Sequence, residues 1–332
     1  MLDSWAARIL LNTSEGKSIS MVGSVILASL LFVFAAIAAT KSIALQAFVI
    51  LTVFDLLSLC TALYSHWAAA RNAAGQTPGF SYGYERGEVL AVFSSTVLTQ
   101  LGALFIIKES IERLLEHEDE NSVNFWFVLA SSVIFASHSI VLYGVRNRPL
   151  TIVVTSSGSS WLQEHAADLS HALCRFVPGL SRFLLPRVNP FALLGVVGYI
   201  LCLIDYLLVE SYQCYACDTM VALCIAVATI GTMFPLASYT GRILLQTSPT
   251  HVVPQLDKCL REAGTLDGVL EIADDRFWQL SFTKMAGSVV VRVRRDADEQ
   301  LVLAHVTDRL FPIVPELTIQ VNKDTSWRPA LH

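Results

Sequence analysis

Few side chains in the apolar segments of this chain can do chemistry, and most of them are carboxylates. Asp55 lies in the middle of the apolar run 51–57. Ionisable residues in such runs are costly to place in a membrane and are therefore candidate functional residues. Glu164, Asp168 and His171 recur at intervals of four and three residues, so on a helix they share one face. Carboxylates and imidazoles arranged in this way are typical metal ligands.

Other polar residues near these positions have simpler interpretations. Asp205 is the second acid inside an apolar run, and we expect it to be a helix-end carboxylate that reaches the interface or water. We expect His138 and His171 to be hydrogen-bonded histidines that pack between helices. His165 follows Glu164 and points about 100° away from it on a helix. It could replace Glu164 in a site only if that helix rotated or unwound.

The seven cysteines are scattered and do not form the pattern of a secreted disulfide framework. Only Cys214 and Cys217 are closely spaced. We interpret them as incidental residues at a helix end. The alternative is a strained disulfide or a weak metal site, if they lie in a lumenal loop.

The composition indicates a membrane protein. Of 332 residues, 54% are hydrophobic and only 15% are charged, against about 25% charged in soluble domains. The net charge of -5 argues against a nucleic-acid partner, since such proteins carry clustered basic surfaces. We find no nucleophile–base pair and no Gly-rich phosphate loop, so an enzyme is not expected.

Six apolar runs are long enough to cross a bilayer as helices. They lie near residues 19–39, 43–69, 88–107, 124–145, 190–209 and 219–240. The connections before the third run and after the fourth are basic, whereas residues 116–120 are acidic. The positive-inside rule then places both termini in the cytosol. We interpret 160–176 as a short helix and 177–189 as a proline-interrupted break before the fifth span.

From Ser248 onward the pattern is that of a soluble domain. Ser248 and Pro249 can open a helix, and residues 288–295 alternate apolar with charged side chains, as a half-buried strand does. The predicted order is helix, strand, strand, helix, strand. We therefore predict a cytosolic segment at 1–18, an all-α six-helix transmembrane domain at 19–247, and a small cytosolic α+β domain of αββαβ, ferredoxin-like type at 248–332.

Several motifs in these segments resemble one family. The most specific are residues 82–90, with the sequence Tyr-Gly-Tyr-Glu-Arg-Gly-Glu-Val-Leu, and residues 108–114, Lys-Glu-Ser-Ile-Glu-Arg-Leu. Residues 42–45, Asp218, 246–249 and the tail segments 266–272 and 318–321 fit as well. The chain resembles the cation diffusion facilitators, which are zinc transporters.

In such transporters an HxxxD pair on the second span faces an HxxxD pair on the fifth, which together supply a tetrahedral zinc site. The resemblance maps the first pair onto Leu51 and Asp55, and the second onto Glu164 and Asp168. Leu51 has no lone pair, and Glu164 replaces an imidazole. The remaining site of Asp55, Glu164 and Asp168 holds three carboxylates and no nitrogen, so we expect it to bind zinc weakly.

The tail has lost ligands too, because Arg276 stands before the tail tryptophan, where the family often has histidine, and cannot bind a metal. We therefore predict a non-transporting or weakly transporting subunit of a heterodimer with an intact zinc-transporter subunit. The resemblance implies zinc as the transported ion, no tightly bound cofactor, and a place in Golgi or trans-Golgi membranes. The alternative is an active transporter of zinc or manganese through Asp55, Glu164 and Asp168.

Overall fold

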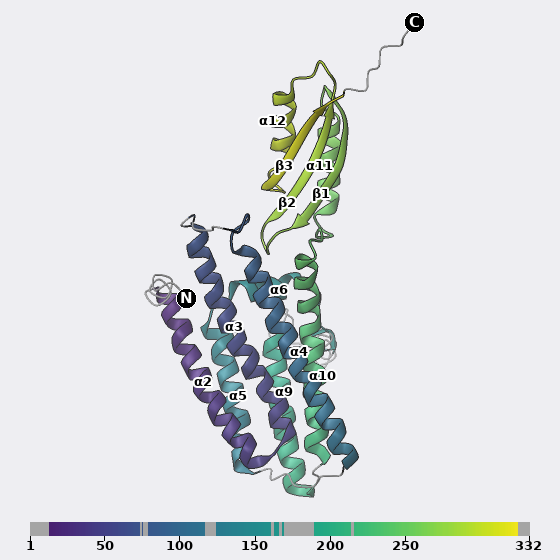
Figure 1. Ribbon diagram of the computed structural model, residues 1–332. Coiled ribbons are helices and arrows are strands. Elements are labelled where there is room, and N and C mark those ends of the chain that lie inside the picture. The colour runs from purple at the N-terminus through teal and green to yellow at the C-terminus, as the bar shows by residue number, and fades with distance from the viewer. Residues whose placement is uncertain are drawn as a thin grey trace, which may run out of the picture. The chain divides into compact units, whose positions relative to one another are not determined.

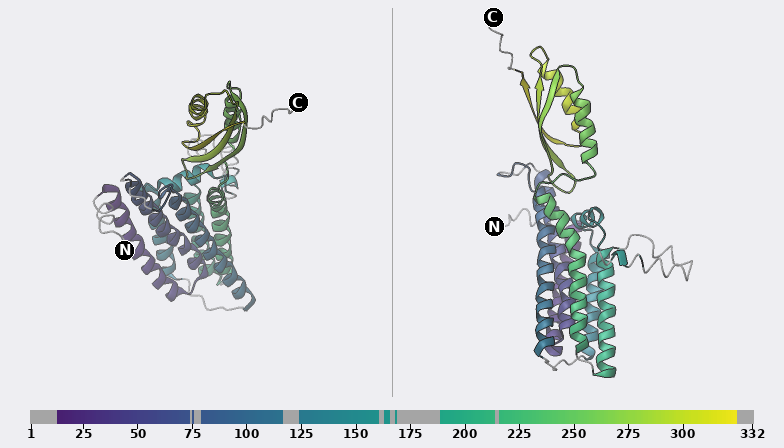
Figure 2. Two further views of the ribbon diagram at one scale, coloured as in Figure 1. Left: turned by 45° about the horizontal axis from the view of Figure 1, so that its top comes forward. Right: turned by 90° about the vertical axis from the view of Figure 1, so that its right-hand side faces the viewer.

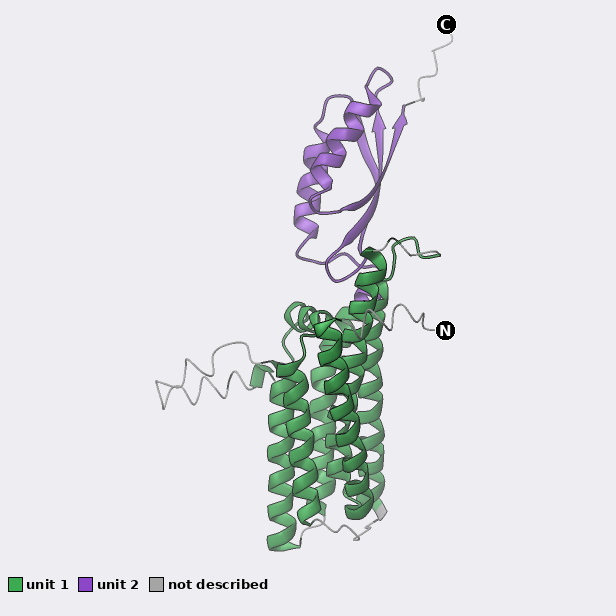
Figure 3. Ribbon diagram, turned by 90° about the vertical axis from the view of Figure 1, so that its left-hand side faces the viewer, with its two compact units in different colours: residues 1–240 green, residues 241–332 purple. Residues whose placement is uncertain are grey.

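The computed structural model forms two compact units, residues 1–240 and 241–332 (Figure 3). It describes residues 13–73, 75, 79–116, 124–160, 163–165, 168, 189–213 and 216–324.

The first unit is a bundle of long apolar helices (Figure 1). In the described residues, six helices are long and apolar enough to cross a membrane. They are α2 (Ser14–Thr40), α3 (Ile43–Ala73), α4 (Glu85–Glu116), α5 (Phe125–Gly144), α9 (Pro190–Tyr212) and α10 (Ala216–Leu244). The six predicted spans are confirmed, and the chain is a multi-pass membrane protein.

Helix α3 is the central helix of this bundle. It packs against α2, α4 and α5, and α5 in turn packs against α9. The two views in Figure 2 show the helices running side by side along their length. In its most apolar stretch, α3 has 67% of its residues buried, the largest share of the six spanning helices in the described chain. A polar side chain halfway along α3 therefore lies inside the bundle and not against lipid.

The starts of two further helices follow from local sequence. Asn147 precedes the short helix α6 (Arg148–Ser156), and its side chain accepts a hydrogen bond from the backbone N–H of Leu150. Asn189 does the same for Phe191 at the start of α9. Proline is the second residue of α6 and the first residue of α9, positions in the first helical turn where its missing N–H costs little. These caps explain why α9 begins at residue 190, as expected for the fifth span.

The second unit has the predicted αββαβ order. Its elements are α11 (Val253–Gly264), β1 (Val269–Gln279), β2 (Met285–Val293), α12 (Glu299–Leu310) and β3 (Glu316–Lys323). The strands form a sheet in the order β1-β2-β3, with β1 antiparallel and β3 parallel to β2. The predicted small α+β domain is confirmed.

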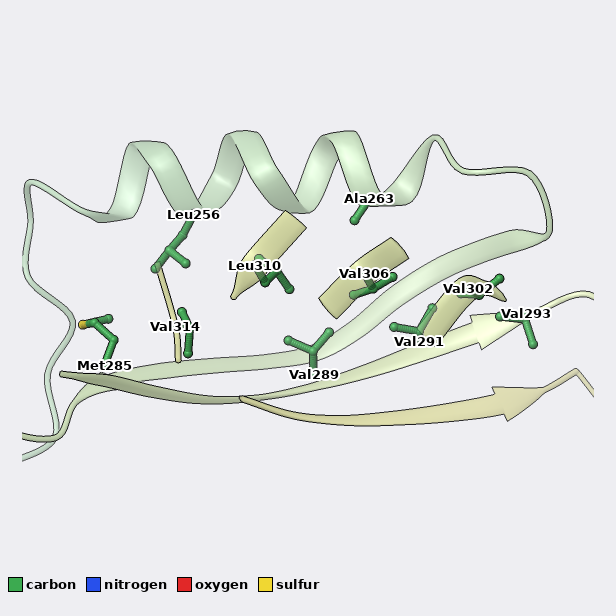
Figure 4. Close-up of a cluster of buried hydrophobic side chains, with 10 residues drawn as sticks. All are labelled: Leu256, Ala263, Met285, Val289, Val291, Val293, Val302, Val306, Leu310 and Val314. Carbon is green, nitrogen blue, oxygen red and sulfur yellow. The ribbon is translucent and has the colours of Figure 1, made fainter. Parts of the chain in front are cut away.

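Both tail helices lie on the same face of this sheet (Figure 4). Val289, Val291 and Val293 alternate along β2 and point toward the helices, where they meet Val306 and Leu310 of α12. All five side chains are nearly or fully buried. Each such burial stabilises the fold by about 1.5–3 kcal/mol relative to exposure, so this face holds the tail unit together.

Candidate functional site

Asp55 lies inside the bundle on the central helix α3. Asp55 is 2% exposed, and the residues next to it in the sequence, Phe54 and Leu56, are apolar. An isolated ionised carboxylate in such a place is strongly disfavoured, so a partner is required. That partner comes from another helix.

The partner is His138 of α5, which is also 2% exposed. Its Nδ1 lies 2.9 Å from Oδ1 and 3.0 Å from Oδ2 of Asp55. Its Nε2 donates to the carbonyl oxygen of Phe191, 3.0 Å away. A carbonyl oxygen can only accept, so Nε2 carries a proton. The pair is electrically neutral whether the remaining proton sits on Nδ1 or on the carboxyl group of Asp55.

Helix α9 leaves room for this imidazole. A Cβ atom at Gly195 would lie 2.7 Å from Cδ2 of His138, closer than real Cβ contacts allow. One turn earlier, the ring of Phe191 stacks on Phe54 of α3 with centroids 4.9 Å apart. Small residues of this kind let neighbouring membrane helices approach closely. Phe191 and Gly195, four residues apart, therefore form the face of α9 toward the pair.

A cavity of about 250 Å³ adjoins the pair in the same unit. Asp55, His138 and Ser58 line it, together with residues of α6. Asn147 closes part of its wall by donating from Nδ2 to the carbonyl oxygen of Ser58, 2.8 Å away. The bundle thus contains a partly polar chamber whose acid is already bonded to histidine.

The structure does not bring the three predicted carboxylates together. Glu164 and Asp168 are exposed, and Glu164 accepts a hydrogen bond from Ser159 at 2.6 Å. His165 is exposed as well. The described residues contain no group of three or more His, Cys, Asp or Glu side chains that could hold a metal ion. Only Asp55 of the predicted set is inside the bundle.

The other residues that were singled out in the sequence lie at different places. Leu51, one turn before Asp55, is buried at 3% exposure and offers only methyl groups. Asp205 was expected to reach the interface or water, but it is fully buried, because α9 continues for about two turns beyond it. His171, Cys214 and most of the predicted helix and break at 160–189 lie outside the described residues.

The prediction that His138 is a hydrogen-bonded histidine between helices is confirmed. Its partner Asp55 was not predicted from the sequence. The available signal was that Asp55 and His138 are both ionisable residues in the middle of apolar runs. In a bilayer, such residues pair with one another. Asp55 and His138 are 83 positions apart, and sequence spacing does not predict which acid and which base on different helices form a pair.

Residues 20–245, more than half of the chain, match the model of the cation efflux transmembrane domain. The chain belongs to the cation efflux family, the cation diffusion facilitators. The resemblance drawn from the sequence motifs is thereby confirmed.

Among cation efflux proteins, the chain is similar to zinc transporter 6 of Homo sapiens and of Bos taurus. It is 50% identical to each over 292 residues, which are 88% of this chain and 62% of each relative. It is 46% identical to zinc transporter 6-A of Xenopus laevis over 333 residues, which are 100% of this chain and 71% of that relative. The chain thus spans about 62% of the length of the first two relatives.

The contacts of α9 can be compared with the metal-ligand pattern of the cation efflux family. In family members with an intact site, an HxxxD pair on the fifth span faces the pair on the second. Here the i, i+4 residues of the fifth span that face Asp55 and His138 are Phe191 and Gly195. Neither side chain can bind a metal. Among the described residues, Phe191 and Gly195 of α9 contact His138, the partner of Asp55, whereas Glu164 and Asp168 are exposed.

Proposed function

We propose that this chain is a non-transporting, or weakly transporting, subunit of a heterodimeric zinc transporter that moves zinc from the cytosol into the lumen of the secretory pathway. The intact partner moves the ion. This chain contributes packing surfaces of its membrane bundle and of its tail unit.

One observation carries the proposal: His138 occupies both carboxyl oxygens of Asp55. A zinc ion needs about four ligands with free lone pairs. Leu51, Phe191 and Gly195 supply none at the other three positions. A zinc ion would also have to displace the imidazole of His138, which is buried and lies within hydrogen-bond distance of both carboxyl oxygens.

The alternative is active transport of zinc or manganese through Asp55, Glu164 and Asp168. Oxygen ligands suit manganese, so the donor types are acceptable. Their placement offers no support, because Glu164 and Asp168 are exposed and Asp55 is 2% exposed. Manganese uptake that falls in Asp168→Ala would favour this alternative over the proposal.

The test is zinc uptake into sealed liposomes that contain the purified full chain, alone or together with an intact cation efflux protein. We expect no uptake above empty liposomes for the chain alone, and uptake by the combination. The control is the intact cation efflux protein reconstituted without this chain. Robust zinc uptake by the unmodified chain alone would overturn the proposal.

Two rebuilt variants separate the two assignments of the fifth-span pair. The first carries Leu51→His, Phe191→His and Gly195→Asp, with His138→Ala to make room for the new aspartate. The second carries Leu51→His and Glu164→His. If α9 supplies the fifth-span positions, the first variant gains zinc binding, measured by equilibrium dialysis, and the second does not.

We further propose a location in Golgi and trans-Golgi membranes, with both termini in the cytosol and a partner of the zinc transporter five type. The basic connections before the third span and after the fourth support this orientation. Protease protection of epitope tags at the two termini in intact Golgi vesicles measures it directly. Tags that remain protected would place the termini in the lumen.

A further inference from the structure

A very short turn joins α2 to α3 at the end of the membrane unit where α9 also gives way to α10 (Figure 1). Helix α2 ends at Thr40 and α3 begins at Ile43, so only two residues lie between them. The first of these, Lys41, is in the left-handed region with φ 55°, and its N–H donates to the carbonyl oxygen of Ile37. Whatever holds this turn therefore holds the adjoining ends of both helices.

The first three N–H groups of α3 bond to side chains. That of Leu45 donates to the hydroxyl oxygen of Ser42 at 3.1 Å. Those of Ile43 and Ala44 donate to Oδ2 and Oδ1 of Asp218, at 2.9 and 3.2 Å. The hydroxyl of Ser42 also donates to Oδ1 of Asp218. Asp218 belongs to the first turn of α10, so one carboxyl group of α10 binds three donors at the start of α3.

These donors are shielded from water. Ser42, Ile43, Ala44 and Asp218 are each 0% exposed. The free N–H groups at the start of a helix need a side chain or water as partner, and a buried donor without one is costly. Without the carboxyl group of Asp218, two N–H groups and one hydroxyl lose their acceptor in a buried place. Separation of α10 from the start of α3 relieves this by letting water reach them.

A second hydrogen bond reaches the same turn from another helix. Arg113 of α4 donates from Nη1 to the carbonyl oxygen of Lys41, 3.0 Å away. This bond is exposed, so water can take the place of either partner. The bonds of Asp218 are buried and have no such substitute. Closure of this end therefore depends on Asp218 more than on Arg113.

The chamber beside Asp55 lies farther along α3. Asp55 is twelve residues after Ile43, or about 18 Å along the helix. The cavity includes Ser58, which is farther still from the turn. Between the turn and Asp55, the side chains of Phe48 and Leu51 are 1% and 3% exposed. A packed stretch of α3 thus separates the chamber from the end that Asp218 holds.

We propose that Asp218 is a latch that keeps this end of the bundle closed to water, and that loss of its hydrogen bonds lets the start of α10 move away from the start of α3. The latch consists of the contacts of one carboxyl group of α10 with Ser42, Ile43 and Ala44. It does not depend on whether the chain transports zinc.

The chain carries its own reporter of such an opening. Cys202 of α9 is 0% exposed and lies about 15 Å before the end of that helix. The test is alkylation of the purified full chain in lipid nanodiscs by iodoacetamide, followed at each cysteine by mass spectrometry. The rate at Cys202 should rise about tenfold or more in Asp218→Ala, the ratio expected when a buried donor loses its partner. Cys259, partly exposed in the tail unit, should react at the same rate in both chains.

Two control variants separate opening of this end from other effects. Thr240 is 0% exposed on α10 and donates to the carbonyl oxygen of Leu236 in its own helix. Thr240→Val removes a buried hydroxyl from α10 but none of the bonds to α3, so the rate at Cys202 should not change. Gly195→Ala strains the bundle at a different place, and well below its unfolding midpoint it should not change the rate either. No rise in Asp218→Ala, or an equal rise in Gly195→Ala, would overturn the proposal.

Milder variants decide the matter if Asp218→Ala does not fold. Asp218→Asn keeps one acceptor oxygen and loses the other, so the rate at Cys202 should still exceed that in Thr240→Val. Ser42→Ala removes one of the three donors to Asp218 and leaves the carboxyl group in place, so its effect should be smaller. A rate at Cys202 that stays at the level of Thr240→Val in both variants would contradict the latch.

Discussion

Removal of His138 should destabilise the membrane unit strongly, because it leaves a buried acid without its base. In His138→Leu, Asp55 keeps its 2% exposure but loses the partner that lies 2.9 and 3.0 Å from its oxygens. Breaking a buried ion pair from one side costs about 3–5 kcal/mol. A leucine of similar size fills the space, so the loss reports on the carboxyl group and not on a void.

A second histidine–acid pair in the described part of the bundle offers a matched control. His66 of α3 lies 3.3 Å from Glu15 of α2, but the two side chains are 29% and 53% exposed. Exposed pairs contribute about 0–1 kcal/mol. His66→Leu makes the same chemical change as His138→Leu, and the difference between the two variants measures the effect of burial.

The assay is thermal unfolding of the full chain in one detergent, followed by circular dichroism. For a domain of 150–250 residues, each kcal/mol shifts the midpoint by about 2–4 °C. We therefore expect His138→Leu to lower the midpoint by roughly 6–20 °C, from these two ranges. The double variant Asp55→Leu with His138→Leu should recover most of this loss, because both partners are then apolar. If His138→Leu shifts the midpoint no more than His66→Leu, the reasoning is refuted.

Two further substitutions test packing in the two units. Gly195→Ala should lower membrane-unit stability by about 1–3 kcal/mol, because the new methyl group meets His138 at 2.7 Å. Gly23→Ala, where a Cβ would be 4.0 Å from its nearest neighbour, should be neutral in the same unfolding assay. Leu310→Ala should cost the tail unit about 2–5 kcal/mol, whereas Leu301→Ala, 57% exposed on the same helix, should cost under 0.5 kcal/mol. Amide hydrogen exchange of β2 in the full chain measures this last pair, and equal protection in both variants would contradict the assigned core.

The sequence by itself determined the architecture. Apolar runs of about twenty residues can only cross a bilayer as helices, because lipid offers no partner for backbone groups. This local rule found all six spans, including the start of α9 at Pro190. Alternation in residues 288–295 likewise identified β2, since one face of a strand must be buried. Motifs such as residues 82–90 were enough to recognise the family.

Only the tertiary structure decided which polar groups meet. The spacing of Glu164 and Asp168 matched a ligand pair, yet both are exposed, while Phe191 and Gly195 occupy the face of α9 toward Asp55. Helical periodicity places residues on a face of their own helix but does not state which neighbour that face meets. The Asp55–His138 pair depends on contacts between helices far apart in sequence, and so it becomes visible only when the bundle is assembled.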